Sequence, residues 1–336
     1  SACKLLVGLG LCAFLLRRGA APETGAAGAI AGVTCGTALR RCPRERGGPL
    51  EPVGDTLGQL LRIGVPITVA GGAMSLMTLL DQSLVLGTLQ ARLGLSAEAA
   101  AELYGQYTFG MTLFVLPPSF IYPLTVSLIP AISQARTRHD DAAAARLTAS
   151  ALRITALLAL PMGVGLSVLA GPILQLLYPA VPETAQAAAY HLTVLGIASI
   201  FVCLMVATNG ILQANGRENV PIWTLLAGGA LKIVTNYLMV GDPATGIRGA
   251  AVSTLYCYAL IAVINLFHIR RLTGSLPPIG KTVCRPLAAT IGMSAAIFIA
   301  QRVLNGALIA APGTMPDKLI TLACIGVAVV VYAVLL

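Results

Sequence analysis

The chain alternates long apolar stretches with short polar segments. A membrane-spanning helix needs about 20 apolar residues, and about ten stretches approach or exceed that length. None of them alternates polar and apolar residues with a period of two, so the pattern favours helices over barrel strands. The predicted spans cover residues 3–16, 25–39, 62–87, 104–132, 148–177, 188–214, 220–240, 246–268, 285–304 and 317–336.

The composition agrees with this pattern. Hydrophobic residues make up 57% of the chain and charged residues 10%, with a mean hydropathy of +0.84. Soluble domains carry about 25% charged residues, so an ordinary soluble enzyme is excluded. The aromatic content of 5% and the scarcity of charge also exclude a nucleic-acid-binding protein, despite the net charge of +9. We therefore predict an all-α polytopic membrane protein with about ten transmembrane helices.

The distribution of basic residues predicts the orientation of the spans. Cytoplasmic loops are enriched in Lys and Arg. Of the 22 basic residues, about twice as many lie in the even-numbered loops as in the odd-numbered ones. We therefore expect the even-numbered loops, and with ten spans both chain termini, to lie in the cytoplasm.

Two segments of the chain resemble each other. Residues 23–39 (ETGAAGAIAGVTCGTAL) align without gaps to residues 244–260 (ATGIRGAAVSTLYCYAL), and each copy begins a span of the same direction. If this is not chance, the unit is a parallel repeat of six helices. It then implies that about four further helices precede Ser1. The chain also lacks an initiator methionine and stops within an apolar run, so we expect a fragment of a longer protein.

Three polar residues within predicted spans require an explanation. Lys232 lies near the middle of span 220–240, Asn236 shares its helix face four residues later, and Asp81 lies in the outer half of span 62–87. A charge at mid-membrane costs about 2.5–3.5 kcal/mol on insertion scales. The residues either line a polar, substrate-facing cavity, or have a structural role, as a buried Lys–Asp pair or a snorkelling lysine that pins two helices. The pattern leaves both readings open.

Asn209 and Gln213 form a second polar pair, four residues apart at the end of span 188–214. They share a helix face, which suits hydrogen bonding between helices as well as cavity lining.

Prolines are concentrated in span 104–132. A proline inside a helix removes a backbone hydrogen bond and kinks the helix, a change that membrane helices tolerate where neighbours satisfy the freed carbonyl group. Kinked spans suit a carrier that works by alternating access, and irregular packing without motion is the alternative. The candidate kink or gating positions are Pro66, Pro117, Pro118, Pro123 and Pro130.

Catalytic and metal-binding patterns are absent from the sequence. The eight cysteines form no CxxC pair and mostly lie in apolar runs, where cysteine behaves as a small hydrophobic residue. The acidic pair Asp140–Asp141 has no acidic partner motif downstream, and no phosphate-binding loop of the GxxxxGK[ST] type occurs. We predict neither enzyme activity, nor a cofactor, nor a metal site.

Several motifs together resemble a known superfamily of transporters. They are RIGVPITV…LLDQSLV at 62–85, FVLPPSFIYPLTVSLIPAIS at 114–133, GPILQLLYP at 171–179, GILQANGREN at 210–219 and LKIVTNYLMV…GIRGAAVSTL at 231–255. In order and spacing they resemble the multidrug/oligosaccharidyl-lipid/polysaccharide exporter superfamily. The resemblance is strongest to polysaccharide biosynthesis proteins related to stage V sporulation protein B and to the lipid II flippase.

The resemblance implies a fold of fourteen helices, with two six-helix lobes around a cavity and two additional helices. This chain would correspond to helices five to fourteen, a MATE-like exporter fold lacking the first four helices. The implied domains are 1–50 (the last two helices of the N-terminal lobe), 51–275 (the C-terminal lobe) and 276–336 (the additional helix pair).

The resemblance also implies a function. Such proteins flip an undecaprenyl-pyrophosphate-linked sugar or peptidoglycan precursor across the bacterial plasma membrane. The partners would be the lipid-linked glycan, membrane lipids and a coupling ion. Lys232, Asp81 and Asn236 would face the cavity, where a cation suits the pyrophosphate. One departure is that lipid II flippases carry several cavity arginines, whereas spans 62–87 and 104–132 have none within the membrane core.

Two other functions stay open at this point. A cation-coupled multidrug antiporter shares the implied fold. A membrane-embedded polyprenyl-phosphate sugar transferase is a different class, and it would need paired carboxylates or a His/Asp pair at one membrane face; the sequence offers neither.

Overall fold

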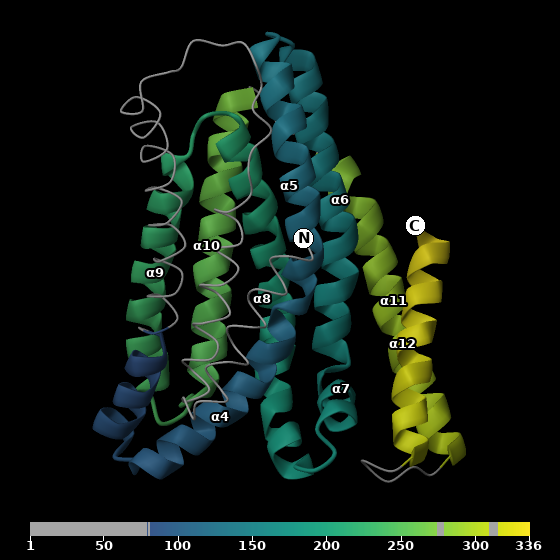
Figure 1. The fold of residues 1–336 in the computed structure, drawn as a ribbon. Coiled ribbons are helices and arrows are strands. Elements are labelled where there is room, and N and C mark those ends of the chain that lie inside the picture. The colour runs from purple at the N-terminus through teal and green to yellow at the C-terminus, as the bar shows by residue number, and fades with distance from the viewer. Residues whose placement is uncertain (1–78, 80, 274–278, 309–314) are drawn as a thin grey trace, which may run out of the picture. The chain divides into compact units, whose positions relative to one another are not determined.

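The computed structural model describes residues 79, 81–273, 279–308 and 315–336, all within one compact unit over Thr68–Leu336. Figure 1 shows that this part of the chain consists of helices joined by short connections. The predicted spans 3–16 and 25–39, the first copy of the repeat and Pro66 lie outside the described residues.

The helices follow one another with short turns. A helix over residues 81–93 comes first, and we refer to it as the 81–93 helix. It is followed by α4 (Ala97–Phe114), α5 (Leu116–Thr137), α6 (Asp141–Val168), α7 (Ala170–Leu177), α8 (Pro182–Ala214), α9 (Asn219–Val240), α10 (Arg248–Thr273), α11 (Ile279–Leu308) and α12 (Met315–Leu335).

Seven segments among the described residues are long and apolar enough to cross a membrane. In chain order they correspond to the last seven predicted spans, from 104–132 to 317–336. The prediction of an all-α, multi-pass membrane protein is therefore confirmed.

The first of these segments differs from its prediction. Ala97–Thr137 is 41 residues long, which corresponds to about 60 Å of continuous helix, twice the thickness of a hydrocarbon core. The helix breaks at Val115, immediately before Pro117 and Pro118, whose missing N–H groups cannot continue the hydrogen-bond ladder of α4. As a result α4 lies obliquely at the foot of the upright α5 (Figure 1).

A second predicted span is also divided. Residues 148–177 form the end of α6, a break at Leu169 and the short helix α7. Pro172 has no N–H to donate to the carbonyl of Val168, four residues earlier, which accounts for a break at this point.

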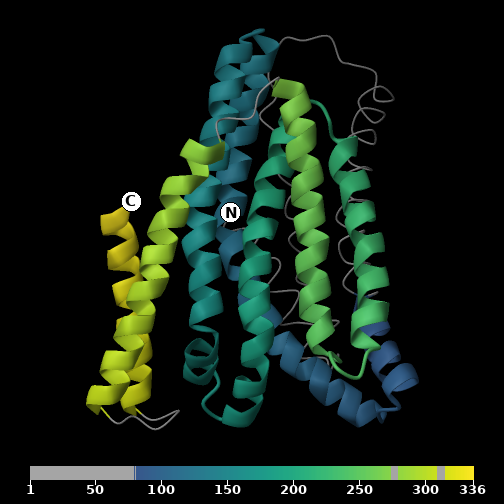
Figure 2. The same ribbon diagram turned by 180° about the vertical axis from the view of Figure 1, so that it is seen from behind.

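Helix α8 lies at the centre of the packing. It contacts α4, α5, α6, α7 and α10, and Figure 2 shows it between α6 and α10. The closest approach is to α6, where Gly163 faces Gly196. A Cβ atom on either glycine would lie 2.7 Å from the carbonyl oxygen of the other. Small residues at such a crossing allow two helix backbones to touch, as in other membrane helix pairs.

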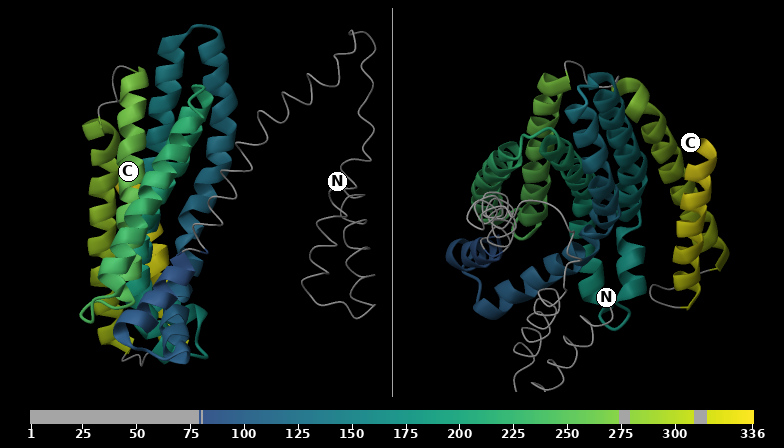
Figure 3. Two further views of the ribbon diagram at one scale, coloured as in Figure 1. Left: turned by 90° about the vertical axis from the view of Figure 1, so that its left-hand side faces the viewer. Right: turned by 45° about the horizontal axis from the view of Figure 1, so that its top comes forward.

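The remaining helices pack on opposite sides of this centre. Helix α9 packs on α10, while α11 packs on α6 and on α12, and α12 also contacts α7. The views in Figure 3 show α11 and α12 beyond α6, on the side away from α9. The C-terminal helix pair is therefore held by α6 and α7.

Candidate functional site

A buried polar network joins the 81–93 helix, α9 and α10. The ammonium nitrogen of Lys232 lies 2.9 Å from Oδ2 of Asp81. The other carboxylate oxygen, Oδ1, accepts a hydrogen bond of 2.6 Å from the side-chain amide of Asn236. The carbonyl oxygen of that amide accepts a hydrogen bond from the hydroxyl of Ser253. Both oxygens of the carboxylate therefore have partners on α9.

This network brings together three of the predicted site residues. Lys232 and Asn236 lie one turn apart on α9 and both reach Asp81, although the sequence left open whether the two charges meet. The Lys232 side chain is 12% exposed and the Asp81 side chain 5%. The pair is thus buried and carries no net charge, as expected for ionised groups in a low-dielectric environment.

A second buried hydrogen bond lies beside this network, between residues that do not stand out in the sequence. Next to Ser253, the Thr254 hydroxyl lies 3.1 Å from the Tyr107 hydroxyl on α4, and both side chains are buried. A stripe of small residues along α10 would have revealed this face, because its members recur every three or four positions. The stripe consists of Gly249, Ala250, Ser253, Thr254 and Cys257.

Arg92 fastens the 81–93 helix to α9 at a second point. Its guanidinium group donates a hydrogen bond of 3.2 Å to the backbone carbonyl of Tyr237 and stacks 4.8 Å from the centre of the Tyr237 ring. In the sequence Arg92 is only one of the basic residues of the odd-numbered loops. The 81–93 helix is therefore attached to α9 both by the buried network and by this contact.

The second predicted polar pair is separated in the structure. Asn209 on α8 accepts a hydrogen bond of 2.7 Å from Asn265 on α10, whose amide nitrogen also lies 3.0 Å from the Thr208 hydroxyl. Gln213 is exposed. Of the two predicted residues, Asn209 joins two helices and Gln213 does not take part.

The four candidate gating prolines that the structure describes all lie in α5. Pro117 and Pro118 occupy its first turn, where an absent N–H costs little. Pro123 and Pro130 lie in its interior. A role in gating stays a prediction.

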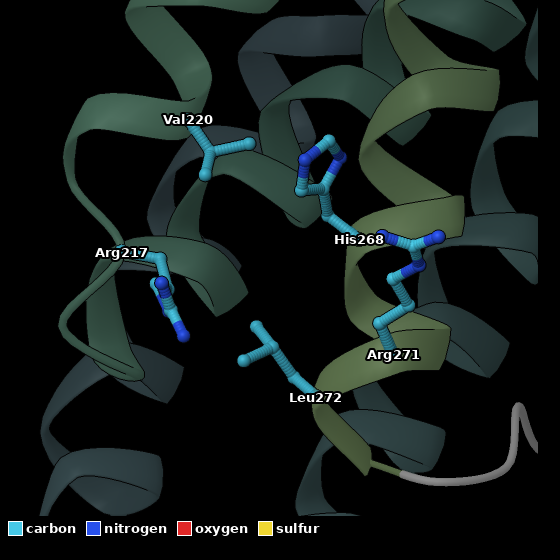
Figure 4. Close-up of a pocket in the computed structure, with 5 residues that line it drawn as sticks. All are labelled: Arg217, Val220, His268, Arg271 and Leu272. Atoms are coloured by element: carbon cyan, nitrogen blue, oxygen red, sulfur yellow. The ribbon is translucent and has the colours of Figure 1, made fainter.

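A basic pocket lies at the end of α9 and α10 away from Arg92. Its volume is about 230 Å³, and Figure 4 shows its lining side chains, two of which are arginines. They come from the α8–α9 loop, the first turn of α9 and the last turns of α10: Arg217, Val220, His268, Arg271 and Leu272. Among the described residues, no group of three or more His, Cys, Asp or Glu side chains is arranged to hold a metal ion.

Comparison with known proteins identifies the family. The model of the lipid II flippase MurJ family matches residues 62–312, about three quarters of the chain. The chain belongs to this family. The match includes α4–α10 and with them the buried network, the α8–α9 loop and the basic pocket.

Two relatives from Bacillus subtilis (strain 168) match part of the chain. The uncharacterized membrane protein YabM is 29% identical over 227 residues, which cover 66% of this chain and 41% of the relative. Stage V sporulation protein B is 25% identical over 211 residues, which cover 62% of this chain and 40% of the relative. The matched region thus spans about two fifths of each relative.

Solved structures support the fold. The lipid II flippase MurJ in its inward closed conformation matches with a TM-score of 0.66 at 14% identity, covering 99% of this chain and 65% of that one. A MOP superfamily transporter from Pyrococcus furiosus matches with a TM-score of 0.51 at 19% identity, covering 82% and 62%. The expected MATE-like exporter fold is confirmed.

Proposed function

We propose that the protein flips a lipid-linked glycan precursor, with undecaprenyl pyrophosphate as the carrier, across the bacterial plasma membrane by alternating access. The observation that carries this proposal is the family match over residues 62–312.

The geometry supports a carrier built from a stiff group of helices. The Gly163–Gly196 contact holds α6 on α8, and the buried network holds the 81–93 helix on α9 and α10. Alternating access moves such groups largely as rigid bodies around a fixed site. In this proposal the break at Val115 and the interior prolines of α5 are the positions where the helices bend.

We assign the Asp81–Lys232–Asn236 network a structural role within this rigid group. The charge of Lys232 is already neutralised by Asp81 at 2.9 Å. A pyrophosphate would therefore have to displace a buried carboxylate that also holds Asn236. Direct recognition of the substrate by Lys232 is the competing interpretation.

The orientation follows from the basic residues. We propose that the end carrying Arg138, Arg217 and Arg271 faces the cytoplasm, because basic residues are retained on that side. The lipid-linked substrate would then be loaded at this end, and both chain termini would be cytoplasmic.

A transport assay in liposomes tests the proposal. The protein in its natural length is reconstituted, and a fluorescent undecaprenyl-pyrophosphate sugar in the outer leaflet is followed by quenching from outside. We expect protein-dependent loss of accessible label and no movement of a phosphatidylcholine carrying the same dye. Repeating the assay with and without Na⁺ and H⁺ gradients identifies a coupling ion.

The same liposomes test the alternative. If the labelled lipid stays in its leaflet while a soluble organic cation moves against its gradient, the protein is a multidrug antiporter and the flippase proposal is wrong. If neither moves but sugar is transferred between polyprenyl phosphates, the protein is a transferase.

A further inference from the structure

Hydrogen bonds fix the backbone on one side of the basic pocket. Helix α8 ends with Gly216 in a left-handed conformation, with φ of +71°. The N–H of Gly216 donates to the carbonyl of Gln213 at 2.9 Å, and that of Arg217 to the carbonyl of Leu212 at 3.0 Å. This pair of bonds is the Schellman motif of a helix C-terminus. It fixes the point from which the Arg217 side chain extends.

The end of α5 forms hydrogen bonds to the α8–α9 loop. Arg136 at the end of α5 donates a hydrogen bond of 2.7 Å to the side-chain oxygen of Asn215. The side-chain nitrogen of Asn215 in turn donates to the carbonyl of Ile211. Ser133 donates to the carbonyl of Ala214 at 3.2 Å. The α8–α9 loop is thus held from outside the pocket.

Helix α10 supplies the opposite wall. His268, Arg271 and Leu272 are spaced by three and four residues and so share one helix face, which Figure 4 shows across the pocket from Arg217. Nδ1 of His268 lies 2.9 Å from the carbonyl of Ile264 and must donate to it, because a carbonyl only accepts. The other ring nitrogen, Nε2, is then an acceptor in the neutral ring and a donor only in the protonated ring.

The positive charge of the pocket is not neutralised within the described part of the chain. By contrast, Arg136, which does not line the pocket, has its guanidinium group 2.6 Å from the Asp141 carboxylate. Neither Arg217 nor Arg271 has a described carboxylate within ion-pair distance, although the exposed Glu218 follows Arg217 in sequence. Arg271 instead stacks 4.5 Å from the centre of the Phe267 ring. Two arginines and a histidine therefore face a space that suits an anion.

Exposed aromatic side chains place the pocket at headgroup depth. Trp223 on the first turns of α9 is 70% exposed and Phe267 on α10 is 51% exposed. Trp and Tyr of transmembrane proteins are enriched at the membrane–water interface, so Trp223 is the residue that indicates this depth. Val220 and Leu272 add apolar walls beside the arginines, as a ligand with a charged head and an apolar body requires.

We propose that this pocket binds the phosphate group of an anionic membrane phospholipid, with Arg217 and Arg271 donating to its oxygens and His268 lining the wall beside them. Arginine forms paired hydrogen bonds to phosphate oxygens, and basic pockets between transmembrane helices bind lipid headgroups. A bound headgroup would bridge the α8–α9 loop and the end of α10. The site is independent of the transport activity proposed above.

The single tryptophan of the chain provides a local probe. The protein is placed in bilayers of phosphatidylcholine that contain either brominated phosphatidylglycerol or brominated phosphatidylcholine, and quenching of Trp223 reports which lipid lies nearby. We expect brominated phosphatidylglycerol to quench at lower mole fractions. In the double variant Arg217→Gln/Arg271→Gln this preference should weaken by about 30-fold, because each arginine contributes about a factor of five.

The matched control removes the same charge outside the pocket. Arg138→Gln/Arg270→Gln changes two exposed arginines at the same end of the molecule that do not line the pocket. The control should keep the preference for phosphatidylglycerol. If the pocket variant keeps it as well, or if the control loses it equally, the proposed site is wrong and only general surface charge attracts the lipid.

Competition distinguishes the possible sources of the phosphate. Inorganic phosphate at millimolar concentration should not restore Trp223 fluorescence, and full restoration would overturn the assignment to a lipid. Undecaprenyl pyrophosphate should compete weakly at equal mole fraction. If it displaces phosphatidylglycerol stoichiometrically and the displacement needs Arg217 and Arg271, the pocket is a substrate subsite and the phospholipid assignment is wrong.

Discussion

At the scale of single residues, Asp81 and Lys232 form a buried ion pair within the described helices. Removing one partner of such a pair leaves an uncompensated buried charge, which costs about 3–5 kcal/mol, whereas replacing both partners is often close to neutral. The interaction is therefore best tested by comparing single and double variants.

The first prediction concerns this pair. Asp81→Asn and Lys232→Gln should each lower thermal stability in detergent and reduce transport, while the double variant Asp81→Asn/Lys232→Gln should recover most of both. The reason is that the double variant removes both charges and so leaves no unpaired buried charge. The measurements are the melting temperature and the initial rate of the liposome assay.

The outcome separates the two roles of Lys232. A double variant as stable as the wild type but unable to transport would show that Lys232 contacts the substrate, and the structural assignment would fail. Arg138→Gln, an exposed change, controls for loss of one positive charge.

The second prediction concerns the Asn209–Asn265 contact. Asn265→Ala removes two hydrogen bonds between α8 and α10 and should destabilise the protein by about 1 kcal/mol, since such bonds between membrane helices average about 0.6 kcal/mol each. Gln213→Ala should change nothing, because that side chain is exposed. Steric-trap unfolding in bicelles measures both. Equal effects would contradict the assignment.

Individual site residues were partly predictable from the sequence. A charge in a hydrophobic span stands out by its cost, so Lys232 and Asp81 could be found without a structure. Ser253, Thr254 and Arg92 could not be assigned roles in this way, because a hydroxyl on a small-residue stripe or a cation near a span end is ordinary by itself. Their partners lie on other helices, and pairings between distant segments are not contained in local patterns.

At the scale of elements, the α6–α8 crossing depends on the absence of side chains. A Cβ atom at Gly196 would meet the backbone of α6, at 2.7 Å from the Gly163 oxygen and 2.8 Å from the Ser167 nitrogen. Backbone atoms cannot rotate away as a flexible side chain can, so the helices would have to separate.

The third prediction follows from this contact. Gly196→Ala should destabilise the protein by about 1–3 kcal/mol, the usual range for overpacking. Gly165→Ala on α6 is the matched control, because the nearest atom to its Cβ would be a methionine methyl group at 4.0 Å. The control should be neutral or slightly stabilising, since alanine favours helix more than glycine does. Thermal unfolding of both variants in the same detergent provides the comparison. A tolerated Gly196→Ala would mean that the two helices do not touch.

The limits of sequence prediction at this scale appear in α4 and α5. Hydropathy predicted one kinked span over 104–132, whereas the structure has two helices that meet at Val115. The prolines showed that a distortion would occur, but its angle depends on the neighbours of α4. Those neighbours, α8 above all, were not identifiable from the pattern of apolar residues.

At the scale of the whole molecule, the order of spans was the most predictable feature, because hydropathy reports each helix separately and each must satisfy its own backbone hydrogen bonds in lipid. The orientation of the spans in the membrane stays a prediction. Basic residues bias which side of the membrane a loop lies on, but the packing of the helices does not show that side.

The fourth prediction tests this orientation. In a background without the native cysteines, Arg138→Cys in the α5–α6 turn and Asp242→Cys in the α9–α10 turn place single thiols at opposite ends of the helices; both positions are exposed. In intact cells a membrane-impermeant maleimide should label position 242 and not position 138. Permeabilised cells should show labelling at both. The reverse pattern would invert the proposed topology.

The distance in sequence between the two sides of the buried network has a consequence for biogenesis. Asp81 and Asn236 are 155 positions apart, so at about 5–20 residues per second a ribosome takes roughly 8–30 s to make the second side after the first. During that interval the carboxyl group has neither Lys232 nor Asn236 to bind. The 81–93 helix must therefore wait, at the insertion machinery or at the bilayer surface, until α9 arrives. Maturation of this group of helices is then timed by translation, and the ion pair forms as a late assembly step.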